Sequence, residues 1–210
     1  MDIGRRRKSN GSGHNPADGD AGQPTRLAAS RFPDPPNSAR ISYMEVPIPL
    51  ATSRLVLMCG LPCSGKTTLA RRIEAITGSL VLSPDSWMVQ LEVDLWDEPF
   101  RGRLERAMWG LTQELLVRGV SVILDSGYWS RSERDEMRLR SRELGVDVEL
   151  RYLDETMDKL ARRVEARNGT SEWKGTSPIT RAHLEHWMSS WEPPDTAELD
   201  LFDEPLELPT

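Results

Sequence analysis

The residues best suited to chemistry form one loop early in the chain. Residues 60–67 read Gly-Leu-Pro-Cys-Ser-Gly-Lys-Thr, the G-x-x-x-x-G-K-[ST] pattern of a phosphate-binding loop, and an apolar run at 55–59 precedes them. In such a loop the glycines let backbone N–H groups face phosphates, the lysine reaches the β and γ oxygens, and the threonine can bind Mg²⁺. We therefore expect ATP and Mg²⁺ as cofactors. The residues predicted to hold the nucleotide are Gly60, Leu61, Pro62, Cys63, Ser64, Gly65, Lys66, Thr67 and Thr68.

Two aspartates each follow a short apolar run. Asp85 comes after the run at 79–83, which Pro84 ends, and Asp125 comes after the run at 120–124. Sites of α/β proteins lie at the carboxyl ends of the strands. Asp85 is thus a candidate general base that accepts a proton from an acceptor hydroxyl, or alternatively the N-cap of a helix that starts at the next residue. Asp125 is a candidate Mg²⁺ residue beside Thr67, or alternatively an aspartate of a turn.

Arginines and tryptophans supply further candidates. Arg163 and Arg167 precede a polar loop at 169–177 with the character of a mobile lid, so we expect them, with Lys66, to act in catalysis. Arg134 opens the helix after Asp125 and is a candidate for substrate binding. Surface pairing is the alternative for each arginine.

Trp87 and Trp129 lie just beyond the two aspartates, where a flat or apolar substrate would rest. Packing in the core is the alternative for both tryptophans. Two cysteines, Cys59 and Cys63, fit neither a disulfide framework nor a zinc spacing. His183 and His186 have no third ligand beside them, so we expect packing or surface roles.

Hydrophobic periodicity places these residues on a regular alternation of elements. Strands are predicted at 55–59, 79–83, 120–124 and 146–153, and helices at 65–77, 98–118, 131–144, 156–168 and 178–190. This order predicts an α/β fold with a parallel sheet of four to five strands, helices on both faces and a short lid. Polar residues alternate along 146–153, which predicts an edge position.

Length and charge limit the domain plan and the partners. We expect one domain at 51–195, a disordered tail at 1–50 that holds seven of the fifteen prolines, and an acidic tail at 196–210. The net charge is -6, and without the first fifty residues 20 Lys+Arg face 28 Asp+Glu, so nucleic acid is an unlikely partner. No run of eighteen apolar residues exists, which predicts a cytoplasmic protein without a membrane partner. The sequence leaves the oligomeric state open.

The motifs as a set resemble a known family. The segments GLPCSGKTT, LSPDSW, VILDSGYWSRSERD and RRVEARN, spread over residues 53–195, resemble P-loop small-molecule kinases of the AAA_33 type. Chloramphenicol phosphotransferase, zeta toxin and polynucleotide 5′-kinase are similar groups. The resemblance implies a kinase fold in which Asp85 activates the acceptor hydroxyl and Arg163 or Arg167 binds phosphates.

One departure bears on the acceptor. Polynucleotide kinases carry an arginine three residues after the catalytic aspartate, and this chain has Met88 there. We therefore expect transfer of the γ-phosphate to a hydroxyl of a small organic molecule, such as an antibiotic or a nucleoside-like compound, with resistance as a purpose. The alternatives are a polynucleotide or nucleoside 5′-kinase and a regulatory P-loop ATPase that is not a kinase.

Overall fold

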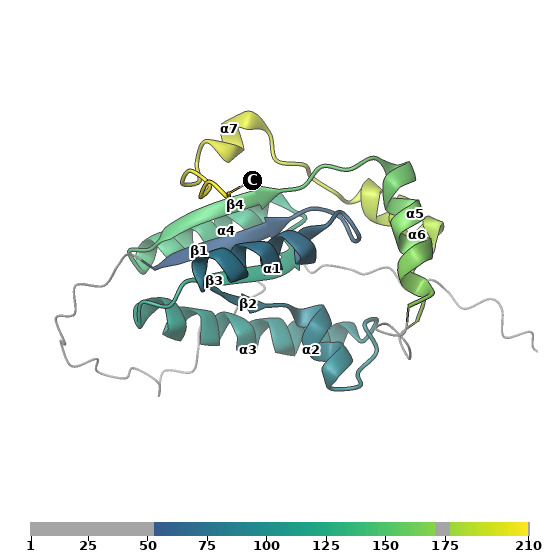
Figure 1. The fold of residues 1–210 in the computed structure, drawn as a ribbon, viewed down its shortest axis with the longest axis horizontal. Helices are drawn as coiled ribbons and strands as arrows, with labels where there is room; N and C mark the ends of the chain where they lie inside the picture. The colour runs from purple at the N-terminus through teal and green to yellow at the C-terminus, as the bar shows by residue number, and fades with distance from the viewer. Residues whose placement is uncertain (1–52, 171–176, 210) are drawn as a thin grey trace, which may run out of the picture.

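A parallel sheet of four strands forms the centre of the protein (Figure 1). The computed structural model describes residues 53–170 and 177–209. In spatial order, the strands are β2 (Leu80–Leu82), β3 (Val122–Gly127), β1 (Arg54–Cys59) and β4 (Asp147–Tyr152). All three neighbouring pairs are parallel, which confirms the predicted fold class. β4 lies at an edge, as its alternating polar residues predict.

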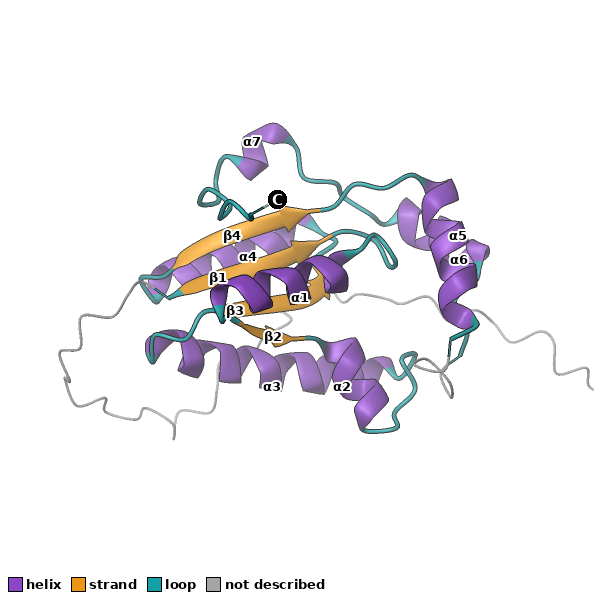
Figure 2. Ribbon diagram, in the orientation of Figure 1, coloured by secondary structure: helices purple, strands orange, loops and turns teal. Residues whose placement is uncertain are grey.

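Helices cover both faces of this sheet (Figure 2). On one face, Val56, Met58 and Ile123 pack against Ala70 and Ile73 of α1 (Lys66–Thr77). The opposite face packs against α3 (Glu98–Val117) and α4 (Arg131–Glu143). Burial of apolar side chains on both faces explains why the strands read as short apolar runs.

Two local features differ from the sequence prediction. A short helix, α2 (Pro84–Gln90), follows β2 directly, and Ser83 caps it by accepting a hydrogen bond from the backbone N–H of Ser86. The last long helix, α6 (Arg181–Ser189), begins three residues after Pro178, so the prediction that Pro178 lies in its first turn is wrong. The Thr180 hydroxyl accepts from the backbone N–H of His183 and fixes the later start.

Helices α5 (Met157–Asn168) and α6 pack on each other beyond the carboxyl ends of the strands (Figure 1). Their buried side chains Leu160, Val164 and Leu184 form a separate apolar cluster with Leu61 of the phosphate loop. This cluster fixes one end of the loop against the helices.

The C-terminal segment runs along the free edge of β4 (Figure 1). It contains α7 (Thr196–Leu199), and after it the backbone N–H of Asp203 donates to the Val148 carbonyl at 2.9 Å. In return the Val148 N–H donates to the Asp203 carboxylate at 2.6 Å. Residues placed in an acidic tail by the sequence analysis therefore cover an edge strand that would otherwise be open. The tail predicted at 1–50 lies outside the described residues.

No helix within residues 53–170 and 177–209 combines the length and the apolar character needed to cross a membrane.

Candidate active site

The phosphate loop leaves β1 through a glycine that no other residue could replace without a clash. Gly60 has φ +148°, and a Cβ there would lie 2.7 Å from the Leu153 carbonyl oxygen and 2.9 Å from the Ser64 hydroxyl. Its backbone N–H donates to the Gly127 carbonyl at 3.1 Å. Gly65, with φ +106°, then leads into α1. The local backbone thus takes the curled path that a phosphate loop requires.

Lys66 and Thr67 occupy the first turn of α1. The Lys66 ammonium is folded over the loop and donates to the Leu61 carbonyl at 2.7 Å. Burial lowers the pKa of Lys66, and the charges of Asp125 and Asp85 partly oppose that shift. A triphosphate in the loop offers this ammonium stronger, charged acceptors than a carbonyl oxygen.

Thr67 and Asp125 form a close pair of oxygen donors. The Thr67 hydroxyl donates to the Asp125 carboxylate at 2.6 Å. Pairing of β1 with β3 shifts register here, so that Asp125 and Ser126 stand opposite Met58, and such bulges redirect side chains. Burial raises the pKa of Asp125, while the Thr67 hydrogen bond and the Lys66 charge lower it.

These two oxygens fit Mg²⁺. Hydroxyl and carboxylate oxygens are the donors that this ion prefers, and it usually combines one or two protein ligands with nucleotide phosphates. No cluster of three or more His, Cys, Asp or Glu residues suits a metal in the part of the chain that the structure describes. A metal held by Thr67 and Asp125 would therefore share its coordination with the nucleotide.

Asp85 faces the same site from α2 and is bound by an arginine. The Arg101 guanidinium of α3 contacts the Asp85 carboxylate at 2.8 Å through Nη1 and the Leu95 carbonyl at 3.0 Å through Nη2. The alternative role of Asp85 as a helix N-cap is wrong, because Ser83 is the cap and Asp85 lies inside the first turn. Sequence reasoning missed Arg101, since nothing local to it signals a partner 16 residues away on another helix.

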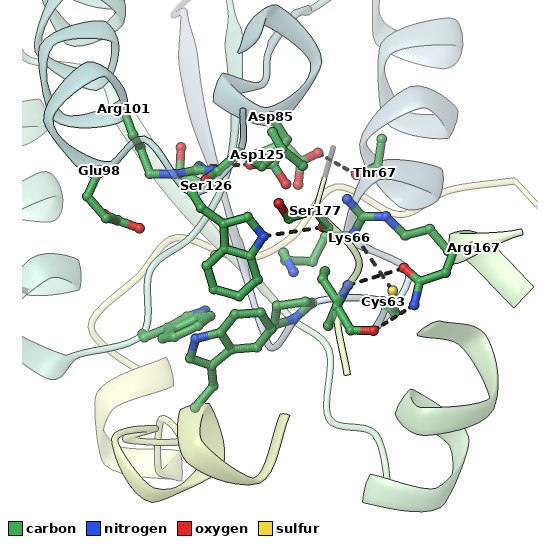
Figure 3. A pocket seen from close by; sticks show the side chains of 18 residues that line it. Cys63, Lys66, Thr67, Asp85, Glu98, Arg101, Asp125, Ser126, Arg167 and Ser177 are labelled. Carbon is green, nitrogen blue, oxygen red and sulfur yellow. Dashed lines mark hydrogen bonds and ion pairs between the residues drawn. The ribbon is translucent and has the colours of Figure 1, made fainter. Parts of the chain in front are cut away.

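The phosphate loop and the two aspartates open into one cavity of about 170 Å³ (Figure 3). A single water needs only about 10–15 Å³, so the space is suited to part of a small molecule. Polar groups from Lys66, Thr67, Asp85 and Asp125 line one side. The apolar lining consists mainly of Leu95, Trp96, Trp129, Ile179 and Trp187.

Of the two predicted substrate tryptophans, Trp129 lines this cavity and Trp87 does not. Trp87 lies on α2 with 39% of its surface exposed, and its predicted substrate contact stays a prediction. Sequence reasoning also missed Trp187, which sits on α6, far along the chain from the phosphate loop. Its position at helical spacing within an apolar stripe gives only the signal of a core residue.

The predicted arginines separate into three different environments. Arg134 is 1% exposed and donates to Glu198 at 2.6 Å and to the carbonyls of Tyr128 and Trp129 at 3.1 Å each. Its predicted role in substrate binding is therefore wrong, because the guanidinium is buried and bound within the protein. The partner Glu198 lies 64 residues away, where the sequence shows only an acidic tail.

Arg163 and Arg167 lie one turn apart on α5 but contact different groups. Arg163 donates to the carbonyls of Cys63 and Ser64, at 3.1 Å and 2.9 Å, and to Glu155 at 2.8 Å. Arg167 lines the cavity, and its Nη1 lies 3.8 Å from the Cys63 sulfur. Arg163 thus supports the loop backbone from outside the cavity, whereas Arg167 faces the phosphate side of the cavity. Most of the predicted lid, residues 171–176, lies outside the described residues.

Solved structures with this fold include proteins of different activities. The chain is similar to a chain of the Pnkp1/Rnl/Hen1 RNA repair complex, with a TM-score of 0.58, 20% identity, and coverage of 66% of this chain and 44% of that chain. It is also similar to a candidate kinase from Chloroflexus aurantiacus, with a TM-score of 0.56, 20% identity, and coverage of 69% and 82%. Kti12 of Chaetomium thermophilum, in complex with ADP-AlF3, is similar with a TM-score of 0.51 and 21% identity. The match covers 68% of this chain and 82% of that chain.

At these identities the structural similarity shows a shared fold alone, and the chain spans less than half of the RNA repair chain. A comparison with the sequences of curated proteins gives no match. The family model AAA_33, described as an AAA domain, matches residues 55–194 and thus includes the phosphate loop, both aspartates and the arginines of α5. With a match over this much of its length, the chain belongs to the AAA_33 family of AAA domains.

Proposed function

We propose that this protein is an ATP-dependent kinase that transfers the γ-phosphate to a hydroxyl group of a small organic molecule. The observation that carries the proposal is the position of Asp85. Its carboxylate lines the same cavity as Lys66 and the Thr67–Asp125 pair, and the cavity continues into an apolar wall where an organic acceptor can bind. A water-activating ATPase has no need of that apolar wall.

The phosphate loop and α1 bind and orient the nucleotide in this proposal. Backbone N–H groups of the loop and the positive end of α1 face the phosphates. Lys66 exchanges its hydrogen bond with Leu61 for the β and γ oxygens. Thr67 and Asp125 hold Mg²⁺, which neutralises phosphate charge when it is bound.

Asp85 prepares the acceptor. Arg101 holds one carboxylate oxygen of Asp85, and the second oxygen is available to accept the proton of the acceptor hydroxyl. The acceptor oxygen forms a bond to the γ-phosphorus as the bond to the bridging oxygen of ADP breaks. The products are a phosphate ester and ADP, and the proton passes from Asp85 to water.

Arg167 and Arg163 are proposed to act on the phosphates in different ways, one directly and one through the loop. Arg167 lines the cavity beside Cys63 and is proposed to contact the transferred phosphate. Arg163 binds two carbonyls of the loop, so we propose that it keeps the loop in shape and acts on the nucleotide indirectly. The sequence prediction gave both residues the same role.

The acceptor is proposed to be a small molecule. Met88, which takes the place of an arginine in polynucleotide kinases, is fully buried in α2 and offers no charge to a nucleic-acid phosphate. An antibiotic or a nucleoside-like compound suits the apolar wall, with resistance as one purpose of the reaction.

The test is incubation with γ-labelled ATP, Mg²⁺ and a panel of hydroxyl compounds that includes oligonucleotide ends. The proposal predicts label on a small organic product and none in a Lys66→Ala variant. Label on oligonucleotide ends would instead favour a repair kinase. Release of labelled phosphate with no phosphorylated organic product would favour a regulatory ATPase and overturn the proposal.

A further inference from the structure

Glu98 gives the cavity a negative charge that the proposed chemistry does not use. It is the first residue of α3 and lines the cavity, and Figure 3 shows its carboxylate directed inward beside Arg101. Among residues 53–170 and 177–209, no side chain or backbone group forms a hydrogen bond or ion pair with this carboxylate. Glu98 is exposed and lies within the electrostatic reach of Arg101, so its carboxylate stands at the open side of the cavity, where a ligand can contact it.

The cationic side chains of the cavity form their hydrogen bonds with groups other than Glu98, although the charge of Arg101 also acts on Glu98. Arg101, one turn along α3 from Glu98, uses Nη1 for Asp85 and Nη2 for the Leu95 carbonyl. Lys66 and Arg167 lie at the phosphate loop, against Leu61 and Cys63. A cationic group of a ligand can therefore pair with the Glu98 carboxylate in this part of the cavity.

Indole rings border the same cavity. The Trp96 and Trp187 rings stack with centroids 5.7 Å apart at 24°, and Trp129 lies 5.7 Å from Trp187 at 57°. The His183 and Trp96 rings lie with their centroids 4.6 Å apart, and burial, together with the nearby His186, lowers the pKa of His183, which favours its neutral form. The faces of indole rings attract organic cations, and tryptophan does so most strongly.

We infer that the acceptor is an amino alcohol or a quaternary ammonium alcohol, with its cationic group between Glu98 and the tryptophans and its hydroxyl at Asp85. Asp85 and Glu98 line the same cavity, and both lie near Arg101 in Figure 3, so one molecule in the cavity can face both carboxylates. The inference rests on the proposed kinase function and names its substrate class. A merely aromatic acceptor would use the indole rings and leave Glu98 without a role.

The test compares two alcohols of nearly the same shape. Choline carries a quaternary ammonium, and 3,3-dimethylbutan-1-ol has a neutral carbon in its place. Dissociation constants of both are measured by calorimetry on the full chain with Mg²⁺ and a non-hydrolysable ATP analogue. The wild type is expected to bind choline about 10-fold more tightly or better, as expected for a partly desolvated cation at indole rings. Equal affinity of the two alcohols would overturn the inference.

Two variants test whether the preference for choline over the neutral alcohol depends on Glu98 and Trp96. Glu98→Gln should bring the preference for choline below about 3-fold, and Trp96→Leu should weaken choline more than the neutral alcohol. Glu114→Gln removes the same charge about 24 Å farther along α3, at 1.5 Å per residue, and should keep the full preference. An unchanged preference in Glu98→Gln would overturn the inference.

Transfer of label separates this inference from the proposed function. Phosphorylation of neutral alcohols as fast as of their ammonium counterparts would refute the substrate class and leave the kinase intact. Choline binding that depends on Glu98, without label on any alcohol, would refute the kinase and leave a cation-binding site.

Discussion

The buried ion pair between Arg134 and Glu198 ties the C-terminal segment to α4. Glu198 accepts two hydrogen bonds from Arg134, at 2.6 Å and 2.9 Å, and the two side chains are 1% and 2% exposed. Arg134 also donates to the carbonyl of Trp129, whose ring lines the cavity. We predict that Glu198→Ala destabilises the protein strongly, because the guanidinium then stays buried without its carboxylate.

The size of the effect follows from burial. Removal of one partner from a buried pair costs about 3–5 kcal/mol. Glu198→Gln keeps the size and one acceptor oxygen, so it should cost about 1.5–3 kcal/mol, the range for a hydrogen bond to a charged group. Glu185→Ala is the matched control: its partner Arg181 is 57% exposed and Glu185 is 58% exposed, so the cost should be at most about 1 kcal/mol.

The assay is urea unfolding at pH 7, followed by tryptophan fluorescence, with the free energy of unfolding compared among the three variants. The order expected for the loss is Glu198→Ala, then Glu198→Gln, then Glu185→Ala. A chain ended after residue 194 should lose at least as much as Glu198→Ala. If Glu198→Ala costs no more than Glu185→Ala, the reasoning about the buried pair is refuted.

Three further outcomes are expected. Gly60→Ala should lower the thermal midpoint more than Gly65→Ala, because a Cβ at residue 60 would lie 2.7 Å from the Leu153 carbonyl, whereas the nearest atom at residue 65 is 3.7 Å away; equal effects would contradict this. Gly110→Ala, in the middle of α3 with nothing within 4 Å of the added Cβ, should add about 0.5–1 kcal/mol to the free energy of unfolding, and a lower stability would contradict it. Burial raises the pKa of Cys59 from near 9 to about 12. At pH values between these two pKa values, unfolding releases the thiol proton. The free energy of unfolding of the wild type should therefore fall with rising pH by up to about 1.4 kcal/mol per pH unit more than that of Cys59→Ala. Denaturant titrations that give parallel pH curves for the two proteins would contradict this.

Local patterns were enough to predict the scaffold. The strands are short apolar runs because both faces of the sheet are covered, and the phosphate loop has a fixed spacing because its backbone must curl around phosphates. Asp85 and Asp125 were found as site candidates because each follows such a run, and parallel strands end at the same edge of the sheet. Their proposed roles stay predictions.

The remaining features depend on tertiary contacts that local sequence does not encode. Arg134 and Arg101 look alike in the sequence, yet one is buried against Glu198 and the other holds Asp85. Trp187 lines the cavity and Trp87 does not, because the rotation of each helix about its axis decides which side chains face the cavity. Long-range pairing and helix orientation set these outcomes.

The most direct test of the account is the turnover of Asp85→Asn with the best acceptor at saturating Mg²⁺ and ATP, with nucleotide affinity measured in parallel. The substitution keeps an oxygen for Arg101 and removes the proton acceptor. We predict a loss in kcat on the order of 10²-fold or more, with the dissociation constant of the nucleotide changed by less than about 3-fold. An unchanged kcat would show that Asp85 does not activate the acceptor and would contradict the account.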